Sequence, residues 1–307
     1  MRVPSVPEAD AMSAETDYAD FPPLVMTFAA SDPSGGSGMQ ADVLTLASMG
    51  CHPLTIVTAL TVQDTLGVEG VFPVDADLIS DQARCVLEDM TVDAFKIGLF
   101  GSVENISAIA EIVADYPDIP LVLDPMLANG RGDELTNDEM ISAIRELILP
   151  QTTIIIATSM EARRLAELLG DDEDGDDPDL AECARRLLKF GCEYVLITGA
   201  HEATPQVINT LYNSKGQVRA DTWQRLPSRF HGAGCTLSAA VAATLANGLD
   251  VPEAVKEAQD YTWHALQQGF RPGMGQYLPD HLFWARDPDA DGETELQPML
   301  QPAPNTH

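Results

Sequence analysis

Short apolar runs alternate with amphipathic helical patterns through most of this 307-residue chain. The apolar runs are typical of buried strands and lie at residues 24–30, 55–60, 94–97, 121–123, 154–157 and 194–198. The helical patterns between them lie at residues 39–49, 77–89, 103–114, 138–149, 160–169 and 180–190. Repeated strand–helix units predict an α/β fold of three layers, a mostly parallel sheet with helices on both faces. Two further runs, residues 207–212 and 217–223, predict a hairpin at one edge of the sheet.

The two ends of the chain differ in composition from its body. Residues 1–20 are acidic and aperiodic, and residues 287–307 are rich in proline, aspartate and glutamine. We predict that both are disordered tails. Residues 21–286 are long enough to bury a large core, so they are predicted to form a single domain.

Charge and cysteine content limit the binding partners and the cellular compartment that we expect for this chain. The net charge of −31 at pH 7 argues against nucleic acid and anionic membranes as partners, and no apolar run is long enough for a membrane span. The five cysteines are an odd number without a C-x-x-C pair, which favours reduced thiols and a cytoplasmic location. Acidity spread over the body suggests a salt-rich cytoplasm. The oligomeric state stays open, with a homodimer as one option.

A first glycine-rich segment, residues 29–42, follows the first apolar run and precedes a helical pattern. Its glycines do not form G-x-G-x-x-G, and no Gly-Lys-Ser/Thr follows, so neither a dinucleotide site nor a P-loop is supported. The segment is nevertheless a loop at the carboxyl end of a strand, where open parallel sheets hold ligands. It therefore predicts close backbone approach to a small ligand.

A second glycine-rich segment, residues 230–240, begins a small-residue helix. Gly232, Ala233 and Gly234 would present unpaired N–H groups to a phosphate oxyanion at the positive end of the helix dipole. Cys235 would then face the transferring phosphoryl group. The helix terminus lowers its pKa and a triphosphate raises it, so we predict a base that takes a proton from an attacking hydroxyl. The alternative is a tight turn followed by a small buried cysteine.

Two patterns that could indicate a metal site do not support one. The acidic run at residues 171–179 lacks carboxylates where a calcium loop needs them, and it is predicted to be a solvated loop between two helices. His231 and Cys235 lie four residues apart, but no third ligand is evident.

Five ordered segments resemble the hydroxymethylpyrimidine/phosphomethylpyrimidine kinases of the ribokinase superfamily. They are Ser31–Asp42, Thr58–Thr65, Lys96–Leu99, Leu123–Pro125 and His231–Thr236, and the similarity spans residues 24–284. The resemblance implies a ribokinase-like fold and phosphorylation of 4-amino-5-hydroxymethyl-2-methylpyrimidine, then of its monophosphate, in thiamine biosynthesis. It also implies ATP and Mg²⁺ as cofactors.

The same resemblance assigns roles on the substrate side. Gln63 would read the aminopyrimidine edge, for which an amide offers both a donor and an acceptor, and Asp42 would hydrogen-bond the substrate. The walls around the ring would be Ala30, Thr61, Leu99 and Met126. The simpler alternative for Gln63 and Asp42 is that both are solvated surface residues.

On the nucleotide side, the resemblance places Asp124 and Glu161 near Mg-ATP, with the metal held through water. The plain alternatives are a strand-end turn aspartate for Asp124 and a glutamate favouring a first helical turn for Glu161. Positioning and charge neutralisation are what phosphoryl transfer mainly requires, and these residue types supply them. For this chemistry, the two glycine-rich segments must open into the same crevice.

The chain departs from the family at three positions. Thr158 stands where relatives carry the asparagine of an Asn-x-x-Glu pattern, and Thr198 stands where many carry a lysine that contacts ATP. Arg131, beside a lost lysine position, is predicted to clamp the phosphates instead; an unchanged KM for ATP in Arg131→Ala would disprove this. Two alternatives stay open: a pyridoxal-type vitamin kinase and a catalytically weak, pyrimidine-binding regulatory protein.

Overall fold

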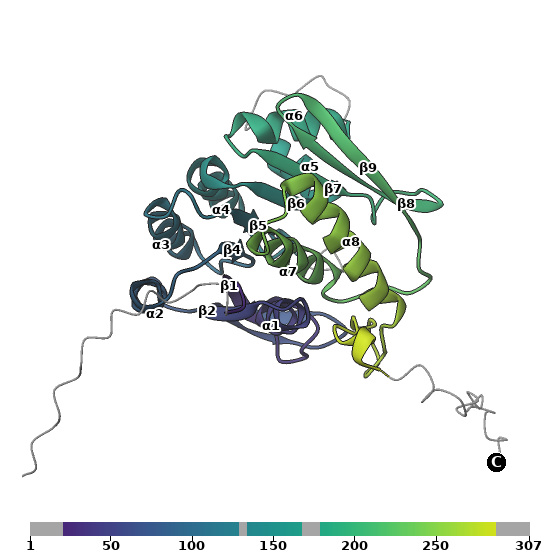
Figure 1. Ribbon diagram of the computed structural model, residues 1–307, viewed down its shortest axis with the longest axis horizontal. Helices are drawn as coiled ribbons and strands as arrows, with labels where there is room; N and C mark the ends of the chain where they lie inside the picture. The colour runs from purple at the N-terminus through teal and green to yellow at the C-terminus, as the bar shows by residue number, and fades with distance from the viewer. Residues whose placement is uncertain (1–20, 129–133, 168–178, 287–307) are drawn as a thin grey trace, which may run out of the picture.

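The computed structural model describes residues 21–128, 134–167 and 179–286. The predicted tails, Arg131 and most of the acidic run at residues 171–179 lie outside these residues. Within them, nine strands form one sheet in the order β3-β2-β1-β4-β5-β6-β7-β8-β9 (Figure 1). The sheet carries helices on both faces, which confirms the predicted three-layer α/β fold.

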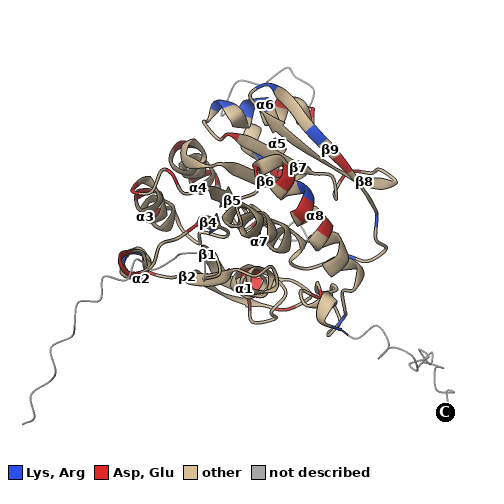
Figure 2. Cartoon of the chain, viewed as in Figure 1, with Lys and Arg blue, Asp and Glu red and all other residues tan. Residues whose placement is uncertain are grey.

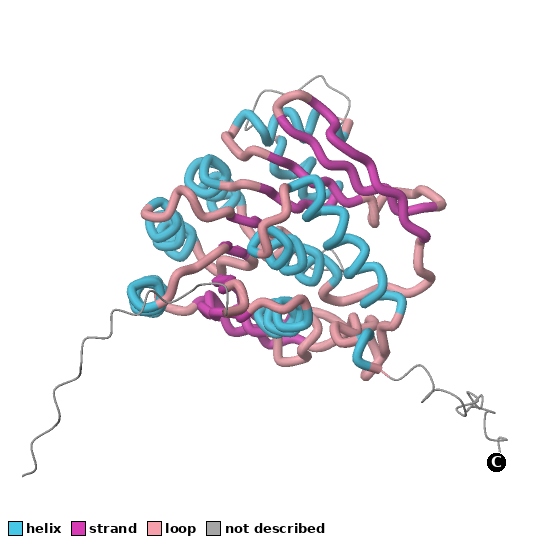
Figure 3. The backbone as a smooth tube through the Cα atoms, in the orientation of Figure 1, coloured by secondary structure: helices cyan, strands magenta, loops and turns pink. Residues whose placement is uncertain are grey.

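Six strands form the parallel centre of the sheet. They are β1 (Leu24–Ser31), β2 (His52–Gln63), β4 (Ala94–Ile97), β5 (Leu121–Leu123), β6 (Ile154–Thr158) and β7 (Tyr194–Thr198). The predicted hairpin is confirmed as β8 (Gln206–Asn213) and β9 (Gly216–Gln224), which close one end of the sheet (Figure 3).

The opposite edge strand, β3 (Val68–Pro73), was not predicted. It pairs antiparallel with the end of β2, so that Leu60 lies opposite Phe72 and Val62 opposite Gly70. Gly70 and Pro73 weaken the strand pattern, and the side chains of this edge are half-buried or exposed. The alternation of apolar and polar residues therefore does not predict a strand at this edge.

The helices divide between the two faces of the sheet, as two separate apolar clusters show. One face is covered by α2 (Ala76–Asp89), α3 (Val103–Ala114), α4 (Asp138–Ala143), α5 (Ser159–Ala166) and α6 (Leu180–Lys189). The other is covered by α1 (Gly38–Ser48), α7 (Ala233–Ala246) and α8 (Val251–Gln267) (Figure 1). The helical pattern expected at residues 138–149 continues beyond α4 as a π-helical segment, Ile144–Ile148, and a 3₁₀ turn, Leu149–Gln151.

Alternation along the central strands decides which side chains face α7. Ala94 and Val122 belong to the apolar cluster under α7, whereas Phe95 and Leu123 belong to the cluster on the opposite face. By the same alternation, Lys96 lies on the α7 side. It is a fully buried lysine within an otherwise apolar strand.

Acidic side chains are spread over the body, on α8 as well as on the helices of the opposite face (Figure 2). Among the residues that the structure covers, no helix combines the length and the apolar character needed to cross a bilayer. All five cysteines lie in the described part of the chain, and none of them forms a disulfide.

Candidate active site

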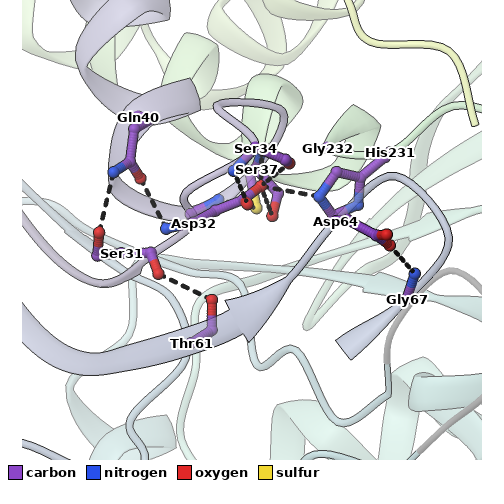
Figure 4. Close-up of polar contacts among 12 residues, drawn as sticks. Ser31, Asp32, Ser34, Ser37, Gln40, Thr61, Asp64, Gly67, His231 and Gly232 are labelled. Atoms are coloured by element: carbon purple, nitrogen blue, oxygen red, sulfur yellow. Dashed lines mark hydrogen bonds and ion pairs between the residues drawn. The ribbon is translucent and has the colours of Figure 1, made fainter. Parts of the chain in front are cut away.

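The two glycine-rich segments meet at the carboxyl edge of the sheet. His231 Nε2 lies 2.8 Å from Asp32 Oδ2, and the Gly38 amide donates a hydrogen bond to Cys235 Sγ at 3.4 Å (Figure 4). The contact is so close that a Cβ on Gly232 would lie 1.6 Å from the carbonyl oxygen of Gly36. The two turns therefore lie against each other, as predicted, and an open crevice between them stays a prediction.

Asp32 organises the first of these loops. Its buried carboxylate accepts hydrogen bonds from the amides of Ser34 and Ser37, both at 2.8 Å, and from their hydroxyls at 2.9 and 3.0 Å. Burial disfavours its ionisation, but the hydrogen bonds from His231 and Ser34 outweigh burial and lower its pKa to about 2. Sequence reasoning assigned no role to Asp32. The serines two and five residues after it were the one sign in the sequence that its carboxylate accepts hydrogen bonds within a turn.

The first turn of α7 presents donors without partners. Gly232 caps the helix in a left-handed conformation (φ 93°), and no side chain caps it. No acceptor is recorded in the described residues for the amides of Ala233, Gly234 and Cys235, and Gly234 is exposed. Unpaired amides at the positive end of a 14-residue helix suit a phosphate oxyanion, as predicted for this segment.

Cys235 lies at the bottom of this turn and is only 3% exposed. Its thiol points to the thioether of Met126, with 3.8 Å between the sulfur atoms. Burial raises the pKa of Cys235, Asp124 and Asp42 raise it further, and Lys96 opposes them. Sequence reasoning considered the helix terminus and the phosphates but not burial, which is the largest influence on this pKa in the folded chain.

Asp124 follows β5 and reaches the same turn. Its carboxylate is 6% exposed, accepts a hydrogen bond from Ser238 Oγ at 3.1 Å, and would lie 3.8 Å from a Cβ on Gly234. Burial raises its pKa to about 7, with Glu161 and Asp42 adding to the effect and Lys96 opposing it. Asp124 is therefore a buried carboxylate next to the α7 turn, and its role at Mg-ATP stays a prediction.

Glu161 makes the capping box of α5. Its Oε2 accepts hydrogen bonds from the amide and hydroxyl of Thr158 at 2.9 and 2.8 Å, and its Oε1 accepts one from the Leu127 amide at 3.0 Å. Burial raises its pKa, against these hydrogen bonds. The alternative reading as a first-turn helix residue is confirmed, and the carboxylate also ties α5 to the loop after β5.

Three of the four predicted ring walls lie together, and one of them, Met126, contacts Cys235. Ala30 and Leu99 share a small apolar cluster with Ala59, and Met126 packs against it. Met126 is the only non-glycine residue with positive φ (45°) in the described part of the chain, a strained conformation of the kind found at functional sites. This apolar surface suits a flat ring.

The end of β2 brings two polar side chains, Thr61 and Gln63, next to the first loop. Gln63 is half-buried, and no hydrogen-bond partner is recorded for its amide group among the described residues. Thr61 donates its hydroxyl to the Ser31 carbonyl at 2.9 Å, which joins β2 to the first loop (Figure 4). The structure thus leaves the amide of Gln63 open to a ligand, as its predicted role requires.

Asp42 differs from both sequence readings. It is not a surface residue, since its side chain is 0% exposed and pairs with Lys96 at 3.0 Å. Thr27 Oγ1 donates to it at 2.6 Å. A carboxylate without exposed surface cannot make the predicted hydrogen bond to the substrate in this structure, because α1 and the sheet enclose it.

Thr198 ends β7, half-buried, next to a turn at residues 199–204 that Arg225 holds. The Arg225 guanidinium donates to the carbonyls of Ala200, Thr204 and Glu202 at 2.7, 3.0 and 2.9 Å. Sequence reasoning assigned Arg225 no role, because a single arginine at the end of a strand carries no pattern.

The described residues hold no group of three or more His, Cys, Asp or Glu side chains placed to bind a metal. The oxygens of Glu161 are already engaged by three protein donors. The donor set therefore fits Mg²⁺ that arrives with nucleotide phosphates and keeps its waters, rather than an ion held by protein alone.

Comparisons with known proteins agree with this geometry. The profile of the family described as Phosphomethylpyrimidine kinase matches residues 32–280. A hydroxymethylpyrimidine/phosphomethylpyrimidine kinase of Streptomyces coelicolor is 37% identical over 262 residues, which are 85% of this chain and 94% of that protein.

Two solved structures extend the comparison. An ADP complex of Bacillus subtilis pyridoxal kinase superposes with a TM-score of 0.76 at 29% identity, covering 86% of this chain and 98% of the other. A phosphomethylpyrimidine kinase from Clostridium difficile 630 superposes with a TM-score of 0.67 at 29% identity, covering 80% and 99%. Both have the fold seen here.

Proposed function

The chain belongs to the phosphomethylpyrimidine kinase family, and we propose that it transfers the γ-phosphoryl group of ATP to 4-amino-5-hydroxymethyl-2-methylpyrimidine and then to the monophosphate. The product is the pyrimidine diphosphate used in thiamine biosynthesis. One observation carries the proposal: the unpaired amides of α7 open beside the loop that follows β1, with Cys235 and Asp124 at the junction.

The chain's own groups suit in-line phosphoryl transfer. The substrate hydroxyl oxygen attacks the γ-phosphorus, the bond to the ADP oxygen breaks, and ADP leaves with the electron pair. The amides of Ala233, Gly234 and Cys235 hold the oxygens on which charge develops. The thiol of Cys235 first loses its proton to water, and the thiolate then accepts the proton of the substrate hydroxyl.

Mg²⁺ fits next to Asp124. A carboxylate at the mouth of the α7 turn can orient water around an ion that the nucleotide phosphates bring, and Glu161 supports the loop carrying Leu127. The ion would neutralise charge on the phosphates during transfer.

Gln63 favours an aminopyrimidine over pyridoxal as the acceptor. Its amide offers a donor and an acceptor together, which matches an amino group beside a ring nitrogen. The similarity to pyridoxal kinase structures supports pyridoxal as the second candidate. A purely regulatory protein is the weaker alternative, because a binder has no need of unpaired phosphate-facing amides and buried acids together.

The test is an ATP-consumption assay with the pyrimidine alcohol, its monophosphate and pyridoxal, in Mg²⁺ at low and high KCl. Turnover of both pyrimidines above pyridoxal, with a large loss in Cys235→Ala, supports the proposal. Preferential turnover of pyridoxal would change the substrate. Pyrimidine binding without turnover at any salt would instead favour the regulatory protein.

We also propose a cellular compartment and an oligomeric state for the protein. The described cysteines form no disulfide, which fits a reducing compartment and supports the cytoplasm. A homodimer stays a prediction, and light scattering at low and high KCl tests it.

A further inference from the structure

Beneath the α7 turn, the sheet carries a buried cation on the face where the chemistry is proposed. Lys96 on β4 is 0% exposed, and by strand alternation it lies on the α7 side, as do Thr27 on β1 and Asp124 after β5. A Cβ on Gly98 would lie 3.0 Å from Lys96 Nζ, so the absence of a side chain at Gly98 makes room for the ammonium group.

Asp42 on α1 is the direct partner of this lysine. Lys96 Nζ lies 3.0 Å from both carboxylate oxygens, with the hydrogen bond directed to Oδ2. Oδ2 also accepts the hydroxyl of Thr27 at 2.6 Å, and Oδ1 has no aligned donor among the described residues. The pair is therefore fixed by groups from β1, β4 and α1.

The site around Lys96 contains more acid than base. Asp42 on α1, Asp124 after β5 and Cys235 on α7 act on the lysine directly, and Glu161 on α5 acts on Asp124. Burial disfavours the charge of Lys96, but Asp42, followed by Cys235 and Asp124, outweighs it and raises the lysine's pKa. These acids favour the charged form of Lys96, and its charge acts in turn on the thiol and the acid of the proposed site.

Fold stability alone does not explain this arrangement. Replacing a buried ion pair by well-packed apolar residues is often neutral or stabilising, and the other residues of β4 are apolar. A fixed charge in a dry site, in contrast, acts strongly on neighbouring charge that develops during reaction.

We propose that Lys96 is a positioning residue whose fixed charge favours the Cys235 thiolate and the phosphoryl group transferring above it, and that Asp42 holds Lys96 in place. The inference rests on the proposed function and assigns the reaction an electrostatic residue that does not touch substrate. It also gives Asp42 an indirect role.

The test is the double variant Lys96→Met/Asp42→Asn, which removes both charges with side chains of similar size. We expect kcat to fall on the order of 100-fold, with the KM values for ATP and pyrimidine changed less than threefold. The matched control is Arg84→Met/Asp115→Asn, which neutralises an exposed ion pair of 3.0 Å between α2 and the end of α3 and should leave kcat unchanged. A double variant that folds and retains kcat within threefold of the wild type would overturn the proposal.

Two further measurements keep the test decisive. Should the double variant fail to fold, Lys96→Met alone is expected to lower kcat on the order of 100-fold at unchanged KM, because Asp42, whose pKa burial already raises, then takes up a proton and no charge is left unpaired; an unchanged kcat would overturn the proposal. Should the wild type turn over no alcohol, the proposed function fails on its own. Lys96 is then tested by the affinity for ADP with aluminium fluoride, which must drop in the double variant and not in the control.

Discussion

Asp32 Oδ2 accepts a hydrogen bond from His231 Nε2 at 2.8 Å, which joins two loops 199 residues apart in the chain. The same carboxylate fixes the turn at Ser34 and Ser37, so one buried acid sets the shape of the first loop and its position against α7. The chain's own hydrogen bonds therefore hold the first turn of α7 and the loop after β1 together.

Asp32→Asn is expected to destabilise the protein by about 2 kcal/mol at pH 7. The pKa of Asp32 is lowered from 3.8 to about 2, so its contribution is complete above pH 3.8 and is lost as the pH falls towards 2. Urea unfolding of wild type and variant at pH 7 and pH 3 measures this. The difference between them should shrink at pH 3, and a difference that is equal at both pH values would contradict the assignment.

Asp124→Asn is expected to stabilise the free protein above neutral pH. The pKa of Asp124 is raised from 3.8 to about 7, so folding retains a proton between these values and wild-type stability falls as the pH rises through this window. Without nucleotide and Mg²⁺, the variant should be more stable at pH 8 by roughly 2–4 kcal/mol and nearly equal at pH 4. Chemical denaturation at both pH values is the measurement, and lost turnover should accompany the gain.

Gly232→Ala should abolish activity through a backbone clash. The new Cβ would lie 1.6 Å from the Gly36 carbonyl oxygen, at a φ of 93°. Gly248→Ala is the matched control, because Gly248 has a φ of 87° with nothing within 4 Å. The control should lose only about 1 kcal/mol of stability and keep its kcat. Similar kinetics for the two variants would argue against the close packing of the loops.

Arg225→Met should raise the KM for ATP several-fold with a smaller effect on kcat, since the turn after Thr198 loses the guanidinium that binds its carbonyls. Arg271→Met is a suitable comparison, because Arg271 also donates to backbone carbonyls, at Met274 and Gly275, on a different loop. Steady-state kinetics at saturating pyrimidine separate the two effects. An equal ATP KM for both variants would remove Arg225 from the nucleotide side.

Much of the fold could be predicted because each central strand is an apolar run between amphipathic helices. The edge strand at Val68–Pro73 could not, since its residues are exposed or only half-buried and Gly70 interrupts its pattern. The site was only partly predictable. The positions of the glycines in the sequence predict the two turns and the place of Cys235. The burial of Asp42 depends on its partner Lys96, which lies 54 residues away in the chain. A lysine inside an apolar strand was the one signal of that pair in the sequence.

The central claim is that the transferring phosphoryl group sits on the first turn of α7, beside the loop after β1. Protein labelled with ¹⁵N at glycine, titrated with ADP, Mg²⁺, aluminium fluoride and the pyrimidine alcohol, tests it by amide chemical shifts without requiring turnover. The account predicts large shifts at Gly234 and Gly38 and none at the distant Gly191 and Gly248. A saturated complex in which the Gly234 amide does not move would contradict it.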